Sequence, residues 1–378
     1  MSEYIRIFTI INGLAAVHGV LLSFILWVKK RNRKANHILA LMIFLFSIGM
    51  VAQAYISYRF YQVFPFPAPF LAALPFTYGP LFYLYIRALT FRPFGFKRID
   101  LLHALPSVAA LIYYSSLYFK QEGARIMFLE QIYYQQSIAS YLSMILSLLQ
   151  TFIYVVLCVR LLRNHTRKIK ESFSALEKIN LSWIRHMVIM FLLIWLIVVG
   201  LQSLLPDTLL REKLDDAVTY FLISIVIFTI GYRGMSQPEI FAELPGEPSP
   251  PGNGKKYEKT GLSAERSTSL KDQLLRLMTE RRPYLDPELT LGRLAEIMDV
   301  PSHQLSQVIN ENMEQNFYQF INGYRVEEAG RRLSDAETGK DKLIKIAFDS
   351  GFNSLPTFNR VFKDITGKSP SQFRDSRS

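Results

Sequence analysis

The sequence predicts an all-α protein: a seven-helix transmembrane bundle followed by a cytoplasmic domain in which a long helix joins two helix-turn-helix units. Three observations support this fold class. Half of the 378 residues are hydrophobic, a share that favours membrane segments over a soluble chain. Uncharged stretches recur through residues 1–235. From residue 262 onward, the apolar residues instead follow the three-and-four spacing of amphipathic helices.

Seven uncharged stretches are candidates for membrane spans, because a helix needs about 20 apolar residues to cross the hydrocarbon core. They are residues 7–28, 37–58, 66–86, 101–119, 138–159, 187–205 and 217–232. The last stretch has only 16 residues and is the shortest. A signal peptide is the alternative interpretation of the first stretch, but its basic cluster follows the apolar run instead of preceding it.

The loops between the predicted spans differ in charge. Those after spans one, three and five contain 16 Lys and Arg residues, and the opposite side contains six. The positive-inside rule therefore predicts a multi-pass protein of the bacterial inner membrane, with its N-terminus outside and its C-terminal domain in the cytoplasm. The net charge of +12 resides in residues 1–261, since residues 262–378 contain 17 basic and 17 acidic residues. The basic balance therefore reflects the loops and is no sign of nucleic-acid binding.

One helix-turn-helix unit is predicted at residues 342–366. Gly351 allows the backbone to turn with positive φ between two amphipathic helices. Asn353 is the predicted N-cap of the second helix, and Pro356 falls in its first turn. The apolar faces comprise Leu343, Ile346 and Ala347 before the corner, and Phe358, Val361 and Phe362 after it. An ordinary pair of helices with a solvated outer face would show the same spacing, so spacing alone leaves the function open.

A signature at fixed spacing runs through this unit. It comprises Ile346, Ala347, Gly351, Phe352, Ser354, Phe358, Arg360, Phe362, Lys363, Gly367, Pro370 and Arg374. The pattern resembles the second helix-turn-helix of AraC/XylS-type transcriptional regulators, and the resemblance covers about residues 262–375. It implies another unit upstream, which we identify at residues 289–310, and a joining helix at residues 317–333. Asp299 stands where the family usually has glycine, and Asp tolerates the left-handed corner.

Double-stranded DNA is the partner that this resemblance implies. The predicted contact residues are Ser302, His303, Gln304, Ser306 and Gln307 in the first unit, Arg325 on the joining helix, and Ser354, Thr357, Asn359, Arg360 and Lys363 in the second unit. Residues 289–316 have a charge balance of −3, whereas residues 342–378 have +4. Since phosphate contacts dominate affinity, the second unit is predicted to hold the DNA backbone and the first to read bases. A near-neutral domain binds weakly as one copy, which predicts a homodimer.

Proline and glycine are enriched in residues 244–254, which predicts a linker between the two parts. We therefore expect a seven-span domain at residues 1–235, a linker at 236–261 and a DNA-binding domain at 262–378. A further amphipathic helix is predicted at residues 262–281. It either opens the DNA-binding domain or pairs with its copy in a second subunit.

The predicted membrane domain fits three classes of protein: a sensor of an unknown signal, a transporter fused to a regulator, or a passive anchor. Its spans contain no Asp, Glu, Lys or Arg, which argues against ion-coupled transport and against a retinal Schiff base. The prolines between residues 65 and 80 indicate either a kinked helix or the wall of a small cavity. We favour the kinked helix slightly.

No catalytic motif, cofactor site or metal-ligand spacing is present in the sequence. The single cysteine, Cys158, excludes an internal disulfide. The sequence therefore predicts a membrane-embedded regulator of transcription that couples a signal to promoter binding, and not an enzyme. A passively anchored regulator is the main alternative.

Overall fold

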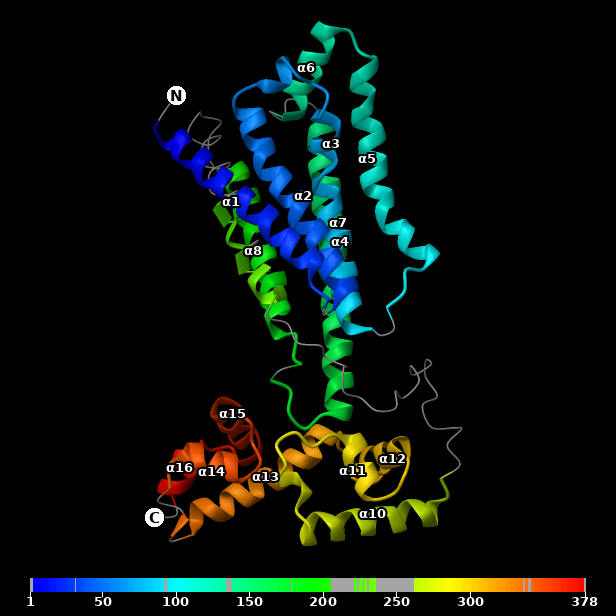
Figure 1. Cartoon of the computed structure of the whole chain (residues 1–378), viewed down its shortest axis with the longest axis vertical. Helices are drawn as coiled ribbons and strands as arrows, with labels where there is room; N and C mark the ends of the chain where they lie inside the picture. Colours follow the sequence, from blue (N-terminus) through cyan, green and yellow to red (C-terminus); the bar gives the residue numbers. More distant parts are fainter. Residues whose placement is uncertain are drawn as a thin grey trace. The chain divides into compact units, whose positions relative to one another are not determined.

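The computed structural model describes residues 3–376 except 31, 92–93, 134–137, 178, 205–220, 223, 227, 230, 236–261, 336 and 339–340. Over these residues the named elements are all helices (Figure 1). The chain divides into two compact units. The first unit comprises residues 1–163 and 181–239, and the second comprises residues 164–180 and 240–378. The predicted linker at 236–261 lies outside the described residues.

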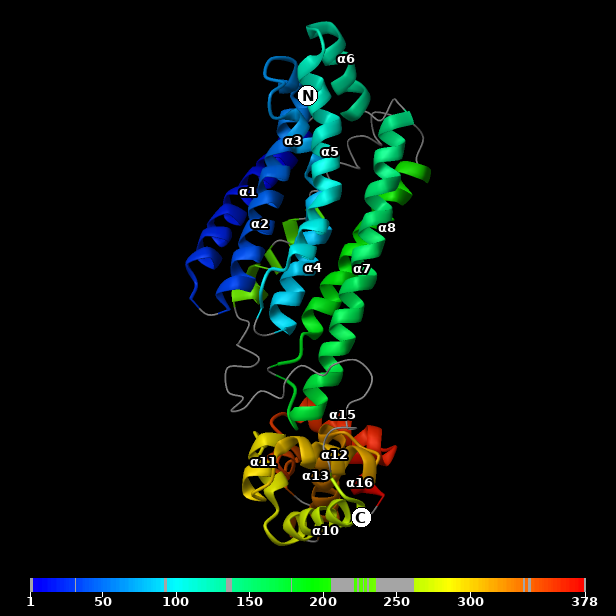
Figure 2. The same cartoon turned by 90° about the vertical axis from the view of Figure 1, so that its right-hand side faces the viewer.

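The first unit is built from helices, the longer of which run beside one another (Figures 1 and 2). They are α1 (Glu3–Val28), α2 (Arg33–Ser57), α3 (Ala68–Ala73), α4 (Pro75–Thr90), α5 (Leu105–Ser115), α6 (Glu122–Tyr133), α7 (Ile138–Ser172) and α8 (Ser182–Leu204). Short 3₁₀ segments lie at Phe60–Gln62, Arg98–Ala104 and Ser116–Phe119. The last residues of α7, from Asn164 onward, belong to the second unit.

Four segments among the described residues are long and apolar enough to cross a membrane. They are Ile10–Val28, Arg33–Ile56, Arg98–Phe119 and Tyr141–Ser172. These four overlap predicted spans one, two, four and five, so the structure supports four spans more clearly than seven. The sixth predicted span lies in α8, whose described apolar part is the shorter segment Ser182–Ile194.

The structure bears differently on the third and seventh predicted spans. The third is divided at Leu74, where α3 ends and α4 begins with Pro75. Proline favours the first turn of a helix because it lacks the N–H that an interior position would donate. The seventh predicted span, residues 217–232, lies partly outside the described residues.

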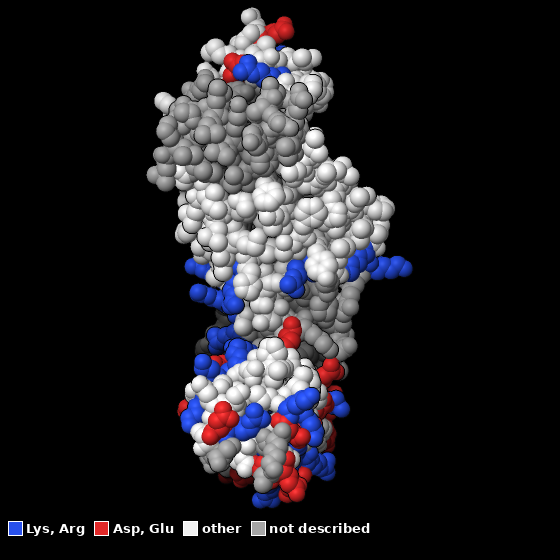
Figure 3. Space-filling model, turned by 90° about the vertical axis from the view of Figure 1, so that its left-hand side faces the viewer, with Lys and Arg blue, Asp and Glu red and all other residues white. Residues whose placement is uncertain are grey.

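The surface of the first unit is apolar to a degree that is unusual for a protein in water. Among its side chains, Ile112 is 69% exposed, Phe152 is 61% exposed and Leu196 is 67% exposed. Figure 3 shows a broad uncharged surface bordered by Lys and Arg side chains. Large exposed apolar patches mark membrane or protein contacts, and a basic border is typical of spanning helices with cytoplasmic loops.

The second unit contains the predicted helix-turn-helix elements. They are α10 (Ala264–Glu280), a 3₁₀ turn at Pro283–Leu285, α11 (Leu291–Ile297), α12 (Ser302–Asn312), α13 (Phe317–Ser334), α14 (Leu343–Asp349), α15 (Leu355–Thr366) and α16 (Pro370–Asp375). The pairs α11–α12 and α14–α15 are the two helix-turn-helix units, and α13 joins them. Their bounds lie within about two residues of the predicted ones.

Two apolar clusters form the core of this unit. One lies under α11 and α12 and includes Leu274 and Met278 of α10. Because α10 is packed into this cluster, it opens the DNA-binding domain, which decides between the two interpretations of residues 262–281. The other cluster lies under α14 and α15 and includes Phe358 and Phe362. It also contains Ile169, from the end of α7.

Candidate DNA-binding surface

Each helix-turn-helix corner depends on one residue with positive φ. In the first helix-turn-helix this is Asp299, with φ of 53°, and in the second helix-turn-helix it is Gly351, with φ of 88°. The predicted left-handed corner at Asp299 is therefore confirmed. At Gly351 a Cβ would lie 2.4 Å from the carbonyl oxygen of Tyr284. Glycine is required there for space as well as for backbone conformation.

The helix after each corner carries predicted DNA-contact residues, and in α15 a side-chain cap fixes the N-terminus. In α15 the N-cap is Ser354, whose Oγ accepts a hydrogen bond from the Thr357 backbone N–H. The predicted N-cap, Asn353, instead donates from Nδ2 to the carbonyl of Pro287 at 3.2 Å. The prediction was one residue too early, because a tertiary contact with the chain just before α11 engages Asn353.

The outer face of α15 carries the cationic part of the predicted site. Asn359, Arg360 and Lys363 are exposed, and Thr357 is half-buried. Arg360 has neighbours in the structure, since Nη2 donates to the Tyr318 hydroxyl at 3.1 Å and Nη1 lies 3.7 Å from an Asp364 carboxylate oxygen. Such exposed ion pairs are weak, so Arg360 remains able to contact DNA.

The outer face of α12 differs from its prediction at one position. His303 is exposed, while Ser302, Gln304 and Ser306 are half-buried. Gln307 is buried, and its Nε2 donates to the Glu311 carboxylate at 2.9 Å. Its side chain therefore extends along the helix toward Glu311, four residues later. Gln307 supports the first reading helix in this structure and does not face outward.

Arg325 of α13 is also buried, although the sequence suggested a DNA contact. Its side chain is 1% exposed, and Nε donates to the Tyr284 carbonyl at 2.8 Å. Nη2 donates to the Asp286 carbonyl at 2.8 Å and to the Ser174 hydroxyl at 3.0 Å. Burial lowers the pKa of Arg325 to about 10, and nearby Glu177 partly opposes this. Arg325 is thus a buried cation that holds backbone segments together.

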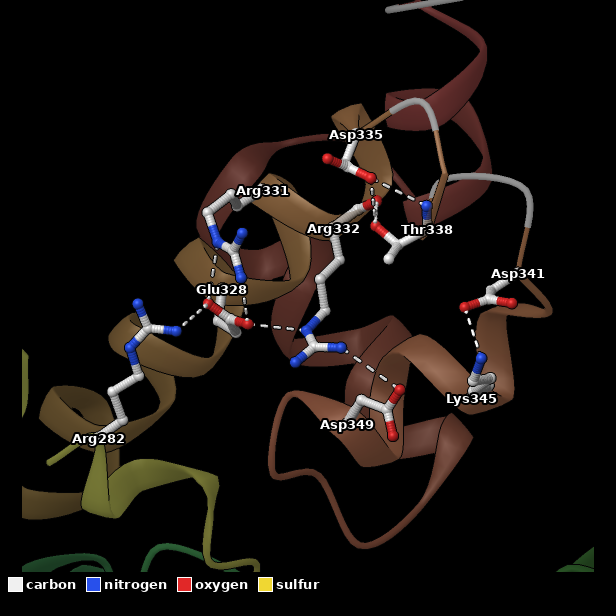
Figure 4. A network of polar contacts seen from close by, with 9 residues as sticks. All are labelled: Arg282, Glu328, Arg331, Arg332, Asp335, Thr338, Asp341, Lys345 and Asp349. Carbon is white, nitrogen blue, oxygen red and sulfur yellow. Dashed lines mark hydrogen bonds and ion pairs between the residues drawn. The ribbon is translucent and has the colours of Figure 1, made fainter.

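A polar network connects the joining helix α13 to α14 of the second helix-turn-helix (Figure 4). At its centre is Glu328 of α13, whose carboxylate accepts hydrogen bonds from Arg331 at 2.8 Å and Arg332 at 2.7 Å. Arg332 Nη1 also lies 3.4 Å from Asp349 of α14, and Arg282 reaches Glu328 at 4.0 Å. Burial would raise the pKa of Glu328, but the hydrogen bonds from Arg331 and Arg332 outweigh it and hold that pKa below its ordinary value. These arginines therefore serve the fold.

Sequence reasoning missed the residues that contact this domain from residues 164–180. Ser174 lies against Arg325, and Glu177 lies against Ser354. A signal was present, because Ile169, Phe173 and Leu176 recur at helical spacing in a loop rich in Lys and Arg. A solvated cytoplasmic loop has no need of such an apolar stripe.

The fold and the two corners define a helix-turn-helix domain, and the comparisons agree. Residues 294–376 match the family model described as a helix-turn-helix domain. The resemblance to AraC/XylS-type regulators is therefore confirmed for the C-terminal part of the chain.

Relatives of known sequence include uncharacterized HTH-type transcriptional regulators of Staphylococcus aureus strains COL and N315. Each is 31% identical over 94 residues, which is 25% of this chain and 12% of the relative. The chain thus spans about an eighth of the length of these relatives, and the similarity concerns a single domain. No solved structure matches.

Proposed function

We propose that this protein is a membrane-embedded, sequence-specific DNA-binding regulator of transcription that couples a membrane or external signal to promoter binding. One observation carries the proposal: a helix-turn-helix domain follows, in the same chain, helices long and apolar enough to cross a membrane. The matching family is one of regulators and not of enzymes. The proposal includes seven spans, an N-terminus outside the cytoplasm and action as a homodimer.

The exposed residues of the two reading helices support the DNA-binding part. Asn359, Arg360 and Lys363 on α15 provide an amide and two cations on one outward face. Arginine and lysine bind phosphates and guanine, and asparagine suits adenine. His303 and Gln304 on α12 add further hydrogen-bonding groups. In contrast, Gln307 and Arg325 are buried in this structure, and we leave both out of the proposed contact set.

The membrane part of the proposal rests on the exposed apolar surface of the first unit and on its four candidate spans. Helix α7 has 35 residues, so at 1.5 Å per residue it is about 52 Å long. A hydrocarbon core of about 30 Å leaves several turns of such a helix outside the bilayer. Its basic residues, beginning at Arg160, all lie in its last four turns.

Sequence selection tests the DNA-binding function directly. The full chain, reconstituted in lipid nanodiscs, would be exposed to a library of random double-stranded DNA at fixed salt, and the bound sequences would be read. We expect one enriched sequence, and we expect the triple variant N359A/R360A/K363A to lose it. The control is Arg276→Ala, which removes a cation from the exposed face of α10. An unselected pool from both wild type and control would refute sequence-specific binding.

A further inference from the structure

The feature of interest is the segment of residues 164–180, which we call the docked segment. It comprises the last residues of α7 and the chain that follows, and it belongs to the second unit together with the DNA-binding domain. Ile169 is 1% exposed within the cluster under α14 and α15, and Leu176 is part of the same cluster. The segment therefore completes an apolar core and does not merely lie on its surface.

Polar contacts fix the register of the docked segment. The Ser174 hydroxyl donates to the Leu289 carbonyl at 2.6 Å and accepts from Arg325 at 3.0 Å. The Ser174 carbonyl accepts from Asn322 Nδ2 at 3.1 Å and from Arg325 Nη1 at 3.3 Å. Withdrawal of the segment would leave buried donors of Asn322 and Arg325 without these partners, which is costly inside a protein. The docked state is thus defined by specific contacts.

The docked segment also lies beside residues that we assign to DNA. Glu177 Oε1 is 3.5 Å from the Oγ of Ser354, the N-cap of α15. Lys170 lies 5.7 Å above the ring of Tyr318, which in turn holds Arg360 through its hydroxyl. In helix-turn-helix proteins the N-terminal residues of the reading helix contact the DNA, and phosphate favours a helix N-terminus. A carboxylate at that position opposes DNA phosphate.

The docked segment also contacts the start of the first helix-turn-helix. Phe173 forms an isolated antiparallel backbone bridge with Thr290. Thr290 is the N-cap of α11, where its side chain accepts from the Arg293 backbone N–H. The docked segment therefore contacts both helix-turn-helix motifs.

We propose that the docked segment and DNA compete for this face of the domain, so that the chain's own residues 164–180 inhibit DNA binding until they are released. The inference rests on the proposed function and names how that site is regulated. Because the segment continues helix α7, a change in the membrane part of that helix has a direct covalent route to the contact at Arg325.

The first test displaces the docked segment by a substitution that lies outside residues 262–378. Leu176→Asp places a charge in the apolar cluster, and Asn164→Asp is the matched control, because Asn164 is exposed in the same segment. DNA affinity of each nanodisc-embedded chain would be measured by fluorescence anisotropy on the selected sequence. We expect Leu176→Asp to bind about tenfold more tightly, within the range usual for coupling between sites, and Asn164→Asp to bind like the wild type.

The second test locks the segment in place and is independent of the first. In a Cys158→Ser background, Glu177→Cys and Ser354→Cys would be joined by a short bifunctional maleimide, and the joined and unjoined forms of the same protein compared. We expect joining to weaken binding at least about tenfold. Equal affinity of the two forms, or weaker binding by Leu176→Asp with its helical content intact, overturns the inference while leaving DNA binding in place. Absence of sequence-specific binding by every form overturns the proposed function itself.

Discussion

At the scale of the residue, the candidate site separates cations that can reach DNA from cations that the fold has already engaged. Lys363 is exposed on α15, whereas Arg325 is buried among backbone carbonyls. Arg331 and Arg332 are held by Glu328. Counting basic residues in this domain therefore overstates its capacity for phosphate contacts. Only the geometry of each side chain shows which charges remain available for contacts with DNA phosphates.

This distinction predicts a specific salt dependence. Replacing Lys363 by Ala should weaken binding to all sequences alike and reduce the slope of log affinity against log salt by about one, because one phosphate contact is lost. Replacing Gln304 by Ala should alter the preferred sequence without changing that slope. Titrations at several salt concentrations measure both. An unchanged slope for Lys363→Ala would remove this residue from the backbone contacts.

A second residue-scale prediction concerns pH. The pKa of Glu328 is lower in the folded protein than its ordinary value of 4.5, so the unfolded state binds more protons in this range. Its stabilising contribution is therefore complete above about pH 4.5 and is lost as the pH falls through the lower, folded value.

The variant Glu328→Gln tests this contribution. We expect it to destabilise the second unit by about 1–3 kcal/mol at neutral pH, since it removes hydrogen bonds between charged groups. We also expect the difference from wild type to shrink as the pH falls below about 4.5. Amide hydrogen exchange in α13, followed from pH 7 to pH 3.5, is the measurement. A constant difference across this range would contradict the assignment.

At the scale of the element, two glycines of the DNA-binding domain have opposite roles. Gly351 has positive φ and no space for a Cβ, since the Tyr284 carbonyl lies 2.4 Å from that position. Gly323 lies within α13, and a Cβ there would meet nothing within 4 Å. The first is therefore required by the corner, and the second weakens a helix.

We expect Gly351→Ala to destabilise the second helix-turn-helix by about 1–3 kcal/mol or more, through backbone strain and steric overlap. Gly323→Ala should stabilise the joining helix by about 0.5–1 kcal/mol. Hydrogen exchange of the α14 and α13 amides measures the two effects. The interpretation of the corner would be wrong if Gly351→Ala left the exchange of the α14 amides unchanged.

At the scale of the whole molecule, the proposed topology assigns each loop to one side of the membrane. A fusion of alkaline phosphatase after Lys120 should be active, because this enzyme is active only outside the cytoplasm and the loop after the fourth predicted span is assigned there. A fusion after Arg33 should be inactive, because the loop after the first span is basic. Enzyme activity in whole cells reports the result. The reverse pattern would invert the proposed orientation.

The domain boundary is also decided at this scale. The sequence indicated a linker at residues 236–261, with residues 1–235 assigned to the membrane part. The structure groups residues 164–180 with the DNA-binding domain. A loop between two predicted spans thus supplies part of a core whose other residues lie more than 100 positions later in the chain.

The sequence by itself determined the features that depend on neighbouring residues. The corners at Asp299 and Gly351 and the bounds of α13 follow from side chains within a few positions. The apolar stripes of α14 and α15 likewise follow from periodicity. Such features are local because backbone conformation and helix capping involve only a turn or two of chain.

Tertiary structure alone decided which outward-facing residues are available to contact DNA. It also decided which loop completes the core of the DNA-binding domain. The buried position of Arg325 depends on Ser174, 151 residues earlier in the sequence. Helices of seven residues, such as α11 and α14, are not stable alone, so packing against distant segments decides their surroundings. Contacts at such separation leave no pattern in the sequence that identifies the partner segment. They arise only when the whole chain has found the packing that buries its apolar stripes and satisfies its buried polar groups.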